Sequence, residues 1–133
     1  MLDNRVLIIE DEAEVSELLA TAVEVTLGCQ VVTASNGEVG LKEALKNVPD
    51  LILLDWLMPK KSGLEVLEAL RANAATKHVP IHMITQKTSI NDVKVARDAG
   101  ADGYFLKPVD FEKFCVWLAE KFPVLAESRR AEA

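Results

Sequence analysis

The feature that most constrains the fold of this chain is a regular alternation of short, mainly apolar segments with longer segments of helical period. Five such apolar segments recur, and after each one the apolar residues return at helical spacing. Residues 6–9 and 51–54 are unbroken apolar runs, and the other segments, residues 30–34, 81–85 and 103–106, are rich in apolar residues. A continuous apolar run indicates a strand buried on both faces, and the intervening spacing indicates amphipathic helices. The pattern therefore predicts five βα units and a parallel sheet covered by helices.

Turn and capping residues place the predicted helices between these runs. Gly28 follows the first helix and Asn36 precedes the second, while Pro49 follows the second and Asp110 precedes the last. The helices are expected near residues 12–27, 37–48, 63–73, 89–99 and 110–122. Right-handed crossovers then give a doubly wound α/β fold with helices on both faces of the sheet. We expect a five-stranded parallel sheet in the flavodoxin-like order 2-1-3-4-5.

Polar residues stand where four of the apolar runs stop. Glu10 and Asp11 follow the first run, Asp55 follows the third, Thr85 ends the fourth and Lys107 follows the fifth. Ligands of open α/β sheets bind beyond the carboxyl ends of the strands, where the strand order reverses. The expected order puts the first and third strands side by side. The sequence therefore predicts that Glu10, Asp11 and Asp55 are neighbours in space.

This set of side chains is suited to a divalent cation and a phosphoryl group. Three close carboxylates repel one another unless a cation neutralises them, and Mg²⁺ prefers a few carboxylates together with phosphate oxygens. An aspartate carboxylate can attack phosphorus, and the charge of the transition state then needs positioned donors. Lys107 and Thr85 offer an ammonium and a hydroxyl for that purpose.

The motifs that contain these residues resemble those of response-regulator receiver domains. They are Ile9-Glu10-Asp11-Glu12, Leu54-Asp55-Trp56-Leu57-Met58-Pro59 with Gly63, Ile84-Thr85 and Phe105-Leu106-Lys107-Pro108. In combination, the acid pair, DxxMPxxxG and KP are highly specific for this family, although each motif alone is weak evidence for it. The resemblance covers residues 4–122. The polar residues 123–133 are expected to form a short C-terminal tail or the start of a linker.

The resemblance implies a role for each matching residue. Asp55 corresponds to the phosphoacceptor, Lys107 to the lysine that binds the phosphoryl group, Thr85 to the switch hydroxyl and Tyr104 to the switch aromatic residue. The Lys107-Pro108 peptide bond is expected to be cis.

The same resemblance implies that Mg²⁺ is the cofactor. Asp11 corresponds to a direct metal ligand, Glu10 to a ligand acting through water, and Asp55 and the backbone carbonyl of Leu57 to further ligands.

As implied by the family, the chain takes a phosphoryl group from a phosphohistidine on a sensor histidine kinase or a histidine phosphotransfer protein. It catalyses only its own phosphorylation and dephosphorylation, so it is not an enzyme with an external substrate. The fourth helix, fifth strand and fifth helix are expected to bind a downstream protein or a second copy.

On the fifth helix, one stripe of residues should face the sheet, whereas Val116 and Trp117 should be partly exposed, and Trp117 and Tyr104 should belong to the partner-binding face. The stripe is Phe111, Phe114, Cys115, Leu118 and Phe122.

Two positions depart from the family pattern. Gln86 follows the switch threonine, where a small residue is usual, and the apolar Leu57 stands two positions after Asp55. Both border the route of water or a phosphodonor to Asp55.

Three alternative functions on related folds would require other residues in this sequence. A flavin or nucleotide site needs a Gly/Ser/Thr-rich loop after the first strand, where this chain has an acidic run. A DxD phosphatase needs an aspartate where Leu57 stands. A non-phosphorylated pseudo-receiver, acting as a protein-interaction module, is the remaining alternative, although it would be expected to lose Asp55 or Lys107.

Composition excludes other classes. The net charge of −6 argues against binding of nucleic acid by this domain, and no apolar run has the length of a membrane span. Cys29 and Cys115 lack metal-site spacing and are expected to be reduced thiols of a cytoplasmic protein. The sequence leaves open whether the chain is a stand-alone receiver or the receiver of a longer regulator.

Overall fold

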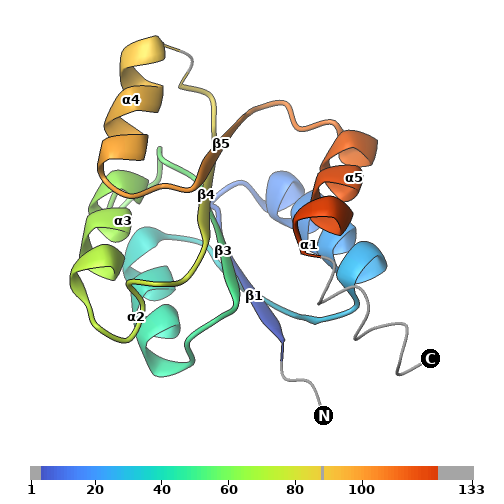
Figure 1. Ribbon diagram of the computed structural model, residues 1–133, viewed down its shortest axis with the longest axis horizontal. Helices are drawn as coiled ribbons and strands as arrows, with labels where there is room; N and C mark the ends of the chain where they lie inside the picture. The colour runs from blue at the N-terminus through green and yellow to red at the C-terminus, as the bar shows by residue number, and fades with distance from the viewer. Residues whose placement is uncertain (1–3, 88, 123–133) are drawn as a thin grey trace.

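Two layers of helices enclose a five-stranded parallel sheet in the computed structural model, which describes residues 4–87 and 89–122 (Figure 1). The strands are β1 (Arg5–Ile9), β2 (Gln30–Ala34), β3 (Leu51–Leu54), β4 (Ile81–Thr85) and β5 (Gly103–Leu106). The helices are α1 (Ala13–Leu27), α2 (Gly37–Lys46), α3 (Gly63–Ala72), α4 (Ile90–Asp98) and α5 (Phe111–Lys121). The sheet order is β2-β1-β3-β4-β5, and every pairing is parallel. The predicted fold class and strand order are confirmed.

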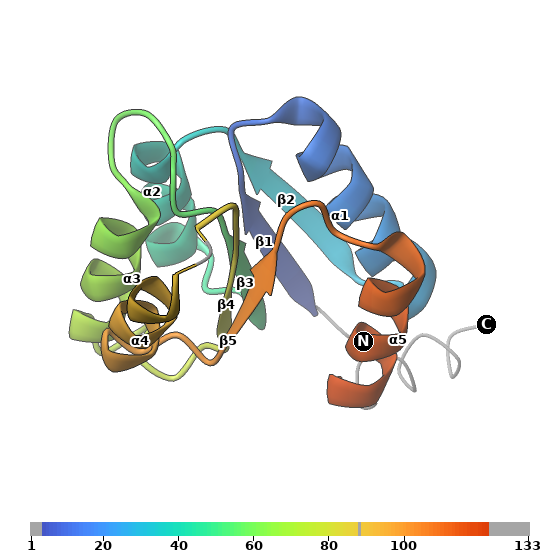
Figure 2. The same ribbon diagram turned by 90° about the horizontal axis from the view of Figure 1, so that it is seen from above.

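The unbroken apolar runs become strands because both of their faces are covered. Helices α1 and α5 lie on one side of the sheet, and α2, α3 and α4 lie on the other (Figures 1 and 2). Within β1, Val6 and Ile8 pack into the core on the α1 and α5 side, whereas Leu7 and Ile9 pack into the opposite core. Alternate side chains of one strand thus contribute to two cores, which leaves no position for a polar residue before the strand ends.

Side chains fix where several helices begin. Asn36 Oδ1 accepts from the backbone N–H of Val39 at 2.9 Å, and Ser62 forms a reciprocal capping box with Glu65. Helix α1 differs, because its N-cap residue, Glu12, makes no side-chain capping bond. The Glu12 carboxylate is therefore available for another contact.

The α5 stripe is confirmed in part. Phe114 and Leu118 are buried against the sheet, but Phe111 is 37% exposed, so its predicted inward orientation is wrong. Phe111 is the first residue of α5 and does not join the core cluster formed by Phe114 and Leu118. Trp117 is half-buried and packs on its own domain, with its ring centroid 4.6 Å from that of Phe105.

His82 of β4 is buried in the same aromatic cluster. Its ring lies 4.7 Å from that of Trp117, and within the described part of the chain its Nδ1 atom finds no hydrogen-bond partner. Burial lowers the pKa of His82 from about 6.5 to about 4. The folded protein therefore stays neutral at His82 under conditions in which the unfolded chain takes up a proton.

We predict that His82→Leu removes part of the acid sensitivity of folding. Because the unfolded chain alone binds this proton, stability falls as the pH drops from about 6.5 towards 4. The native protein should lose about 2 kcal/mol more than the variant between about pH 7 and about pH 5, as measured by urea unfolding. The native protein must be compared with the variant because Glu10 has the opposite effect on stability. Its pKa is raised to about 7, so its protonation stabilises the folded state as the pH falls through this range. Parallel pH profiles of the two proteins would contradict the prediction.

Candidate functional site

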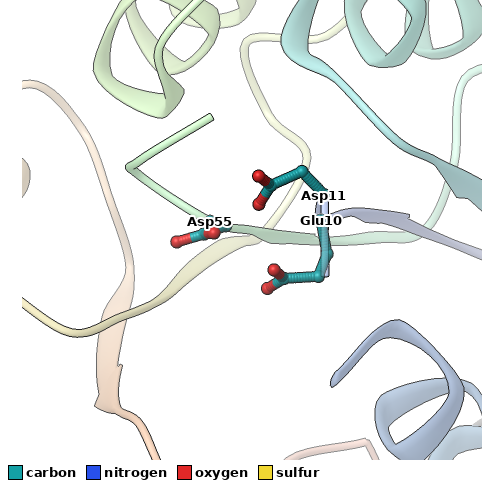
Figure 3. Close-up of side chains that lie close together, drawn as sticks. All are labelled: Glu10, Asp11 and Asp55. Carbon is teal, nitrogen blue, oxygen red and sulfur yellow. The ribbon is translucent and has the colours of Figure 1, made fainter. Parts of the chain in front are cut away.

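The sheet topology brings the predicted acidic residues together. Ile9 of β1 is in register with Leu54 of β3, and the backbone N–H of Asp55 donates to the Ile9 carbonyl at 2.9 Å. Glu10 and Asp55, the residues that directly follow β1 and β3, are therefore neighbours at the carboxyl edge of the sheet. Figure 3 shows Glu10, Asp11 and Asp55 close together at the ends of these two strands. One carboxylate oxygen from each of the three lies within 4.8 Å of the others.

Burial of this cluster opposes its negative charge. Glu10 and Asp55 are buried, whereas Asp11 is exposed at the rim. Burial raises the pKa of Glu10 to about 7, and the charge of Asp55 adds to this effect. Burial likewise raises the pKa of Asp55 above its ordinary value, although Lys107 acts against this. The carboxylates therefore gain from any positive charge placed between them.

Lys107 supplies positive charge from the end of β5. Its Nζ atom donates to Glu12 Oε1 at 2.6 Å, to Glu10 Oε2 at 3.0 Å and to Asp55 Oδ2 at 3.2 Å. Burial alone would lower the pKa of Lys107, but these hydrogen bonds raise it, so the ammonium stays charged. The predicted pairing of Lys107 with the acidic cluster is observed, and Glu12 joins it.

The backbone of the last strands holds Lys107 in place. The Lys107 N–H donates to the Thr85 carbonyl at 2.9 Å, and the Lys107-Pro108 peptide bond is cis, as predicted. Thr85 is fully buried at the end of β4, and its Oγ1 accepts from the backbone N–H of Lys87 at 3.4 Å.

Tyr104 is placed apart from the acidic cluster. Its hydroxyl donates to the backbone carbonyl of Lys87 at 2.7 Å, and its ring meets that of Trp56 edge-on, with centroids 6.4 Å apart. Thr85 and Tyr104 thus both bond to the backbone of Lys87. The sequence paired these two residues only through the family resemblance, and it gave no sign that Lys87 joins them.

A cavity of about 150 Å³ opens beside Asp55. Its lining residues are Asp11, Glu12, Asp55, Leu57, Gln86 and Lys107. The Leu57 side chain is 54% exposed and therefore offers an apolar group at the mouth of this cavity. Both departures from the family pattern, Leu57 and Gln86, border the space in front of Asp55, as expected.

Gly63 brings the loop after β3 back onto Asp55. Its N–H donates to the Trp56 carbonyl at 2.8 Å, and a Cβ atom at this position would collide with the Asp55 carbonyl oxygen. Only glycine allows this close approach of two backbones. The loop that carries Leu57 is thereby closed over the site before α3 begins.

The acidic cluster fits a divalent cation. Across the described residues, Glu10 Oε1 is buried without a hydrogen-bond partner, which leaves a carboxylate oxygen available to a ligand. A buried acceptor without a partner is costly, and a hard cation with oxygen ligands would satisfy it. Asp11, at the rim, supplies a carboxylate that Lys107 does not engage. Three carboxylates with one unsatisfied oxygen are an appropriate donor set.

Glu12 is the site residue that the sequence analysis did not assign. It belongs to the acidic run after β1, but no motif gave it a role, and its contact with Lys107 depends on how the two side chains reach across the cavity. The third acid in succession was the one available signal.

The fold and site define a doubly wound α/β domain whose switch point carries a carboxylate cluster and a lysine. The family model of the response regulator receiver domain matches residues 6–119. This chain belongs to the response regulator receiver domain family. It is thus a receiver of two-component signalling, which works through phosphorylation, and receivers bind a divalent metal at an acidic pocket like the one described.

The sequence relatives include longer transcriptional regulators. The chain is 35% identical over 108 residues to the phosphate regulon transcriptional regulatory protein PhoB of Pseudomonas aeruginosa, covering 81% of this chain and 47% of that protein. It is 38% identical over 109 residues to the transcriptional regulator RpaA of Synechocystis, covering 82% and 45% respectively. The chain therefore spans about half the length of the curated relatives it matches.

Solved structures agree with this assignment. The chemotaxis response regulator CheY4 of Vibrio cholerae superposes with a TM-score of 0.82 at 28% identity, over 90% of this chain and 98% of that one. A CheY-like receiver domain protein of Methanospirillum hungatei gives a TM-score of 0.81 at 25% identity, over 94% of this chain and 98% of that one.

Within the described ranges, every helix is too short or too polar to cross a membrane.

Proposed function

We propose that Asp55 accepts a phosphoryl group from a phosphohistidine carried by a sensor histidine kinase or a histidine phosphotransfer protein. One observation supports this most directly. The Asp55 carboxylate is buried, bonded to Lys107 and adjacent to Glu10, yet it lines a cavity of about 150 Å³ that can admit a phosphoryl group.

In the proposed reaction an Asp55 oxygen forms a new P–O bond as the P–N bond of the phosphohistidine breaks. The electron pair of that bond returns to the imidazole nitrogen of the donor. The Lys107 ammonium and the Thr85 hydroxyl donate hydrogen bonds to the phosphoryl oxygens, where charge develops. Hydrolysis of the acyl phosphate by water regenerates Asp55, so the chain acts only on itself.

Magnesium is the cation we propose for this site. Asp11, Asp55 and the Leu57 carbonyl would bind it directly, and Glu10 would bind through water. When bound, Mg²⁺ neutralises carboxylate and phosphoryl charge together. In the absence of a cation, Lys107 alone offsets the charge of Glu10 and Asp55 among the described residues.

The output is proposed to pass through Thr85 and Tyr104 to the face formed by α4, β5 and α5. Both residues bond to the backbone of Lys87, which precedes α4. Several large apolar residues in or next to these three elements are exposed and are available to a downstream protein or a second copy. They are Ile90, Val93, Leu106, Phe111 and Val116. The acidic domain is not proposed to bind nucleic acid or membranes, and we place it in the cytoplasm with its kinase.

Labelling by acetyl phosphate tests the proposed function. The chain should gain one phosphoryl group in intact-mass spectra when Mg²⁺ is present, and EDTA should prevent it. The fluorescence of Trp56, which directly follows Asp55 and is buried, should report binding of Mg²⁺. Absence of labelling in a folded, Mg²⁺-binding protein would favour the pseudo-receiver alternative.

Slow loss of the phosphoryl group is a further prediction. Hydrolysis needs a water in line with the P–O bond, and the exposed side chain of Leu57 offers that water no hydrogen bond. Leu57→Asn should speed dephosphorylation several-fold, which corresponds to roughly 1 kcal/mol of barrier. The decay of the phosphorylated mass after removal of acetyl phosphate measures the rate.

Leu57→Met is the matched control, because it keeps an apolar group of similar size. Gln86 lines the same cavity and could instead orient the water. If Leu57→Asn is neutral while Gln86→Ala slows hydrolysis, Gln86 orients the water and the prediction for Leu57 is wrong.

A further inference from the structure

The ammonium of Lys107 has no free donor in this structure. Its three N–H groups face three carboxylates, at 2.6 Å for Glu12, 3.0 Å for Glu10 and 3.2 Å for Asp55. An ammonium group can donate three hydrogen bonds and no more. One of these contacts must therefore open before Lys107 can donate to an oxygen of an incoming phosphoryl group.

The contact with Glu12 differs from the other two in its exposure. The side chains of Glu10 and Asp55 are 1% and 4% exposed, whereas that of Glu12 is 53% exposed. Removing the ammonium from a buried carboxylate leaves an uncompensated charge, which is strongly unfavourable. Water can replace the ammonium at Glu12 at a smaller cost, although the exposed ion pair still stabilises the resting arrangement. Glu12 is therefore the partner that Lys107 gives up.

Among residues 4–87 and 89–122, the Glu12 carboxylate contacts no polar group other than Lys107. Glu12 is the N-cap residue of α1, but its side chain makes no capping bond. Instead it reaches Lys107 at the boundary between the cavity beside Asp55 and a second cavity of about 390 Å³ between α1 and the segment after β5. A substitution here can break the ion pair without removing a side-chain cap.

We propose that Glu12 is a positioning residue that holds Lys107 in a resting arrangement and thereby slows phosphorylation of Asp55. The proposal rests on the proposed role of Asp55 as phosphoacceptor. When Glu12 is removed, Glu10 and Asp55 still hold the ammonium, so Lys107 keeps its place and gains a free donor. During transfer that N–H moves to a phosphoryl oxygen, while bond formation and cleavage remain those already described.

Three variants separate this effect from a change of net charge. Glu12→Ala removes the contact with Lys107. Glu12→Asp keeps the charge, but its side chain is one methylene too short to maintain that contact. Glu14→Ala removes an equal charge from a residue that lines the same larger cavity and makes no ion pair with Lys107. The measurement is the initial rate of labelling by acetyl phosphate with Mg²⁺, as a function of acetyl phosphate concentration.

Glu12→Ala and Glu12→Asp should both raise the maximal rate, by roughly fivefold, with an unchanged half-saturating concentration of acetyl phosphate. Glu14→Ala should stay within about twofold of the native rate. Reduced repulsion of the anionic donor would instead lower the half-saturating concentration. Binding of Mg²⁺, followed by tryptophan fluorescence, should be the same in all four proteins.

Several results would overturn the proposal. They are a native rate in Glu12→Asp, equal acceleration in Glu14→Ala, and an unchanged or slower rate in Glu12→Ala. Failure of the proposed function has a different signature, since the native chain would then take no label or Asp55→Asn would take as much as the native chain.

Discussion

Asp55→Asn is expected to abolish acid-labile phosphorylation of the chain. An amide has no anionic oxygen to attack phosphorus, yet it matches the carboxylate in size and still accepts a hydrogen bond from Lys107. The label should fall below detection in intact-mass spectra after incubation with acetyl phosphate and Mg²⁺. Hydroxylamine, which cleaves acyl phosphates, should release the label from the native protein.

The same variant should remain folded. Burial raises the pKa of Asp55, which means that its ionised form is unfavourable in the folded state, and asparagine removes that charge. We therefore expect the urea midpoint of Asp55→Asn to equal or exceed the native value in the absence of Mg²⁺. Asp98→Asn, at an exposed position on α4, is the control and should label normally. Undiminished labelling of Asp55→Asn would remove Asp55 from its proposed role.

The fold could be predicted from sequence because the inner strands β1, β3 and β4 are buried on both faces. Strands of this kind are rich in apolar residues until they end, so the apolar runs mark the strands and the first charged residues after them mark the edge of the sheet. For this reason the sequence places Glu10, Asp55 and Lys107 at one edge. Strand order then brought them together.

Contacts that depend on side-chain reach were not predictable in the same way. Glu12 belongs to the acidic run, but only the folded geometry shows that its carboxylate crosses to Lys107 rather than capping α1. Phe111 fits the apolar stripe of α5 by its period, yet as the first residue of the helix it remains exposed. Periodicity gives the direction of a side chain around a helix, and it does not say what lies opposite each turn.

Trp117 is half-buried, which agrees with the partial exposure predicted from its angle around α5. Its packing against His82, Phe105 and Phe114 could not be predicted from the helical period. A role of Trp117 in binding a partner would have to involve its remaining exposed edge. The exposed apolar residues of α4 and β5 are better candidates for that contact.

Lys107→Ala is expected to slow phosphorylation by roughly a hundredfold while leaving Mg²⁺ affinity undiminished. A positioned donor at the developing charge is typically worth a factor of that size, and the described residues place no other lysine or arginine within ion-pair distance of Asp55. The ammonium competes with a cation for oxygens of Glu10 and Asp55, so its removal should not weaken binding of Mg²⁺. Labelling rates and a Mg²⁺ titration of tryptophan fluorescence measure the two effects.

Two further variants identify which property of Lys107 matters. Lys107→Arg keeps the positive charge but changes the donor geometry, so a rate between those of the native protein and Lys107→Ala would show that position counts as well as charge. Lys113→Ala, on α5, removes a lysine that makes no ion pair in the described structure and should label at the native rate. A rate for Lys107→Ala within twofold of native would exclude Lys107 from phosphoryl transfer.

A double-mutant cycle joins this prediction to the role of Glu12. If Glu12 slows phosphorylation only by occupying Lys107, then Glu12→Ala should accelerate the native protein and have no effect in the Lys107→Ala background. An acceleration that persists without Lys107 would mean that Glu12 acts on the donor or on the cation instead. Because the two side chains meet at 2.6 Å, their free energies of substitution should be strongly non-additive, and the labelling rates of the four proteins measure that coupling directly.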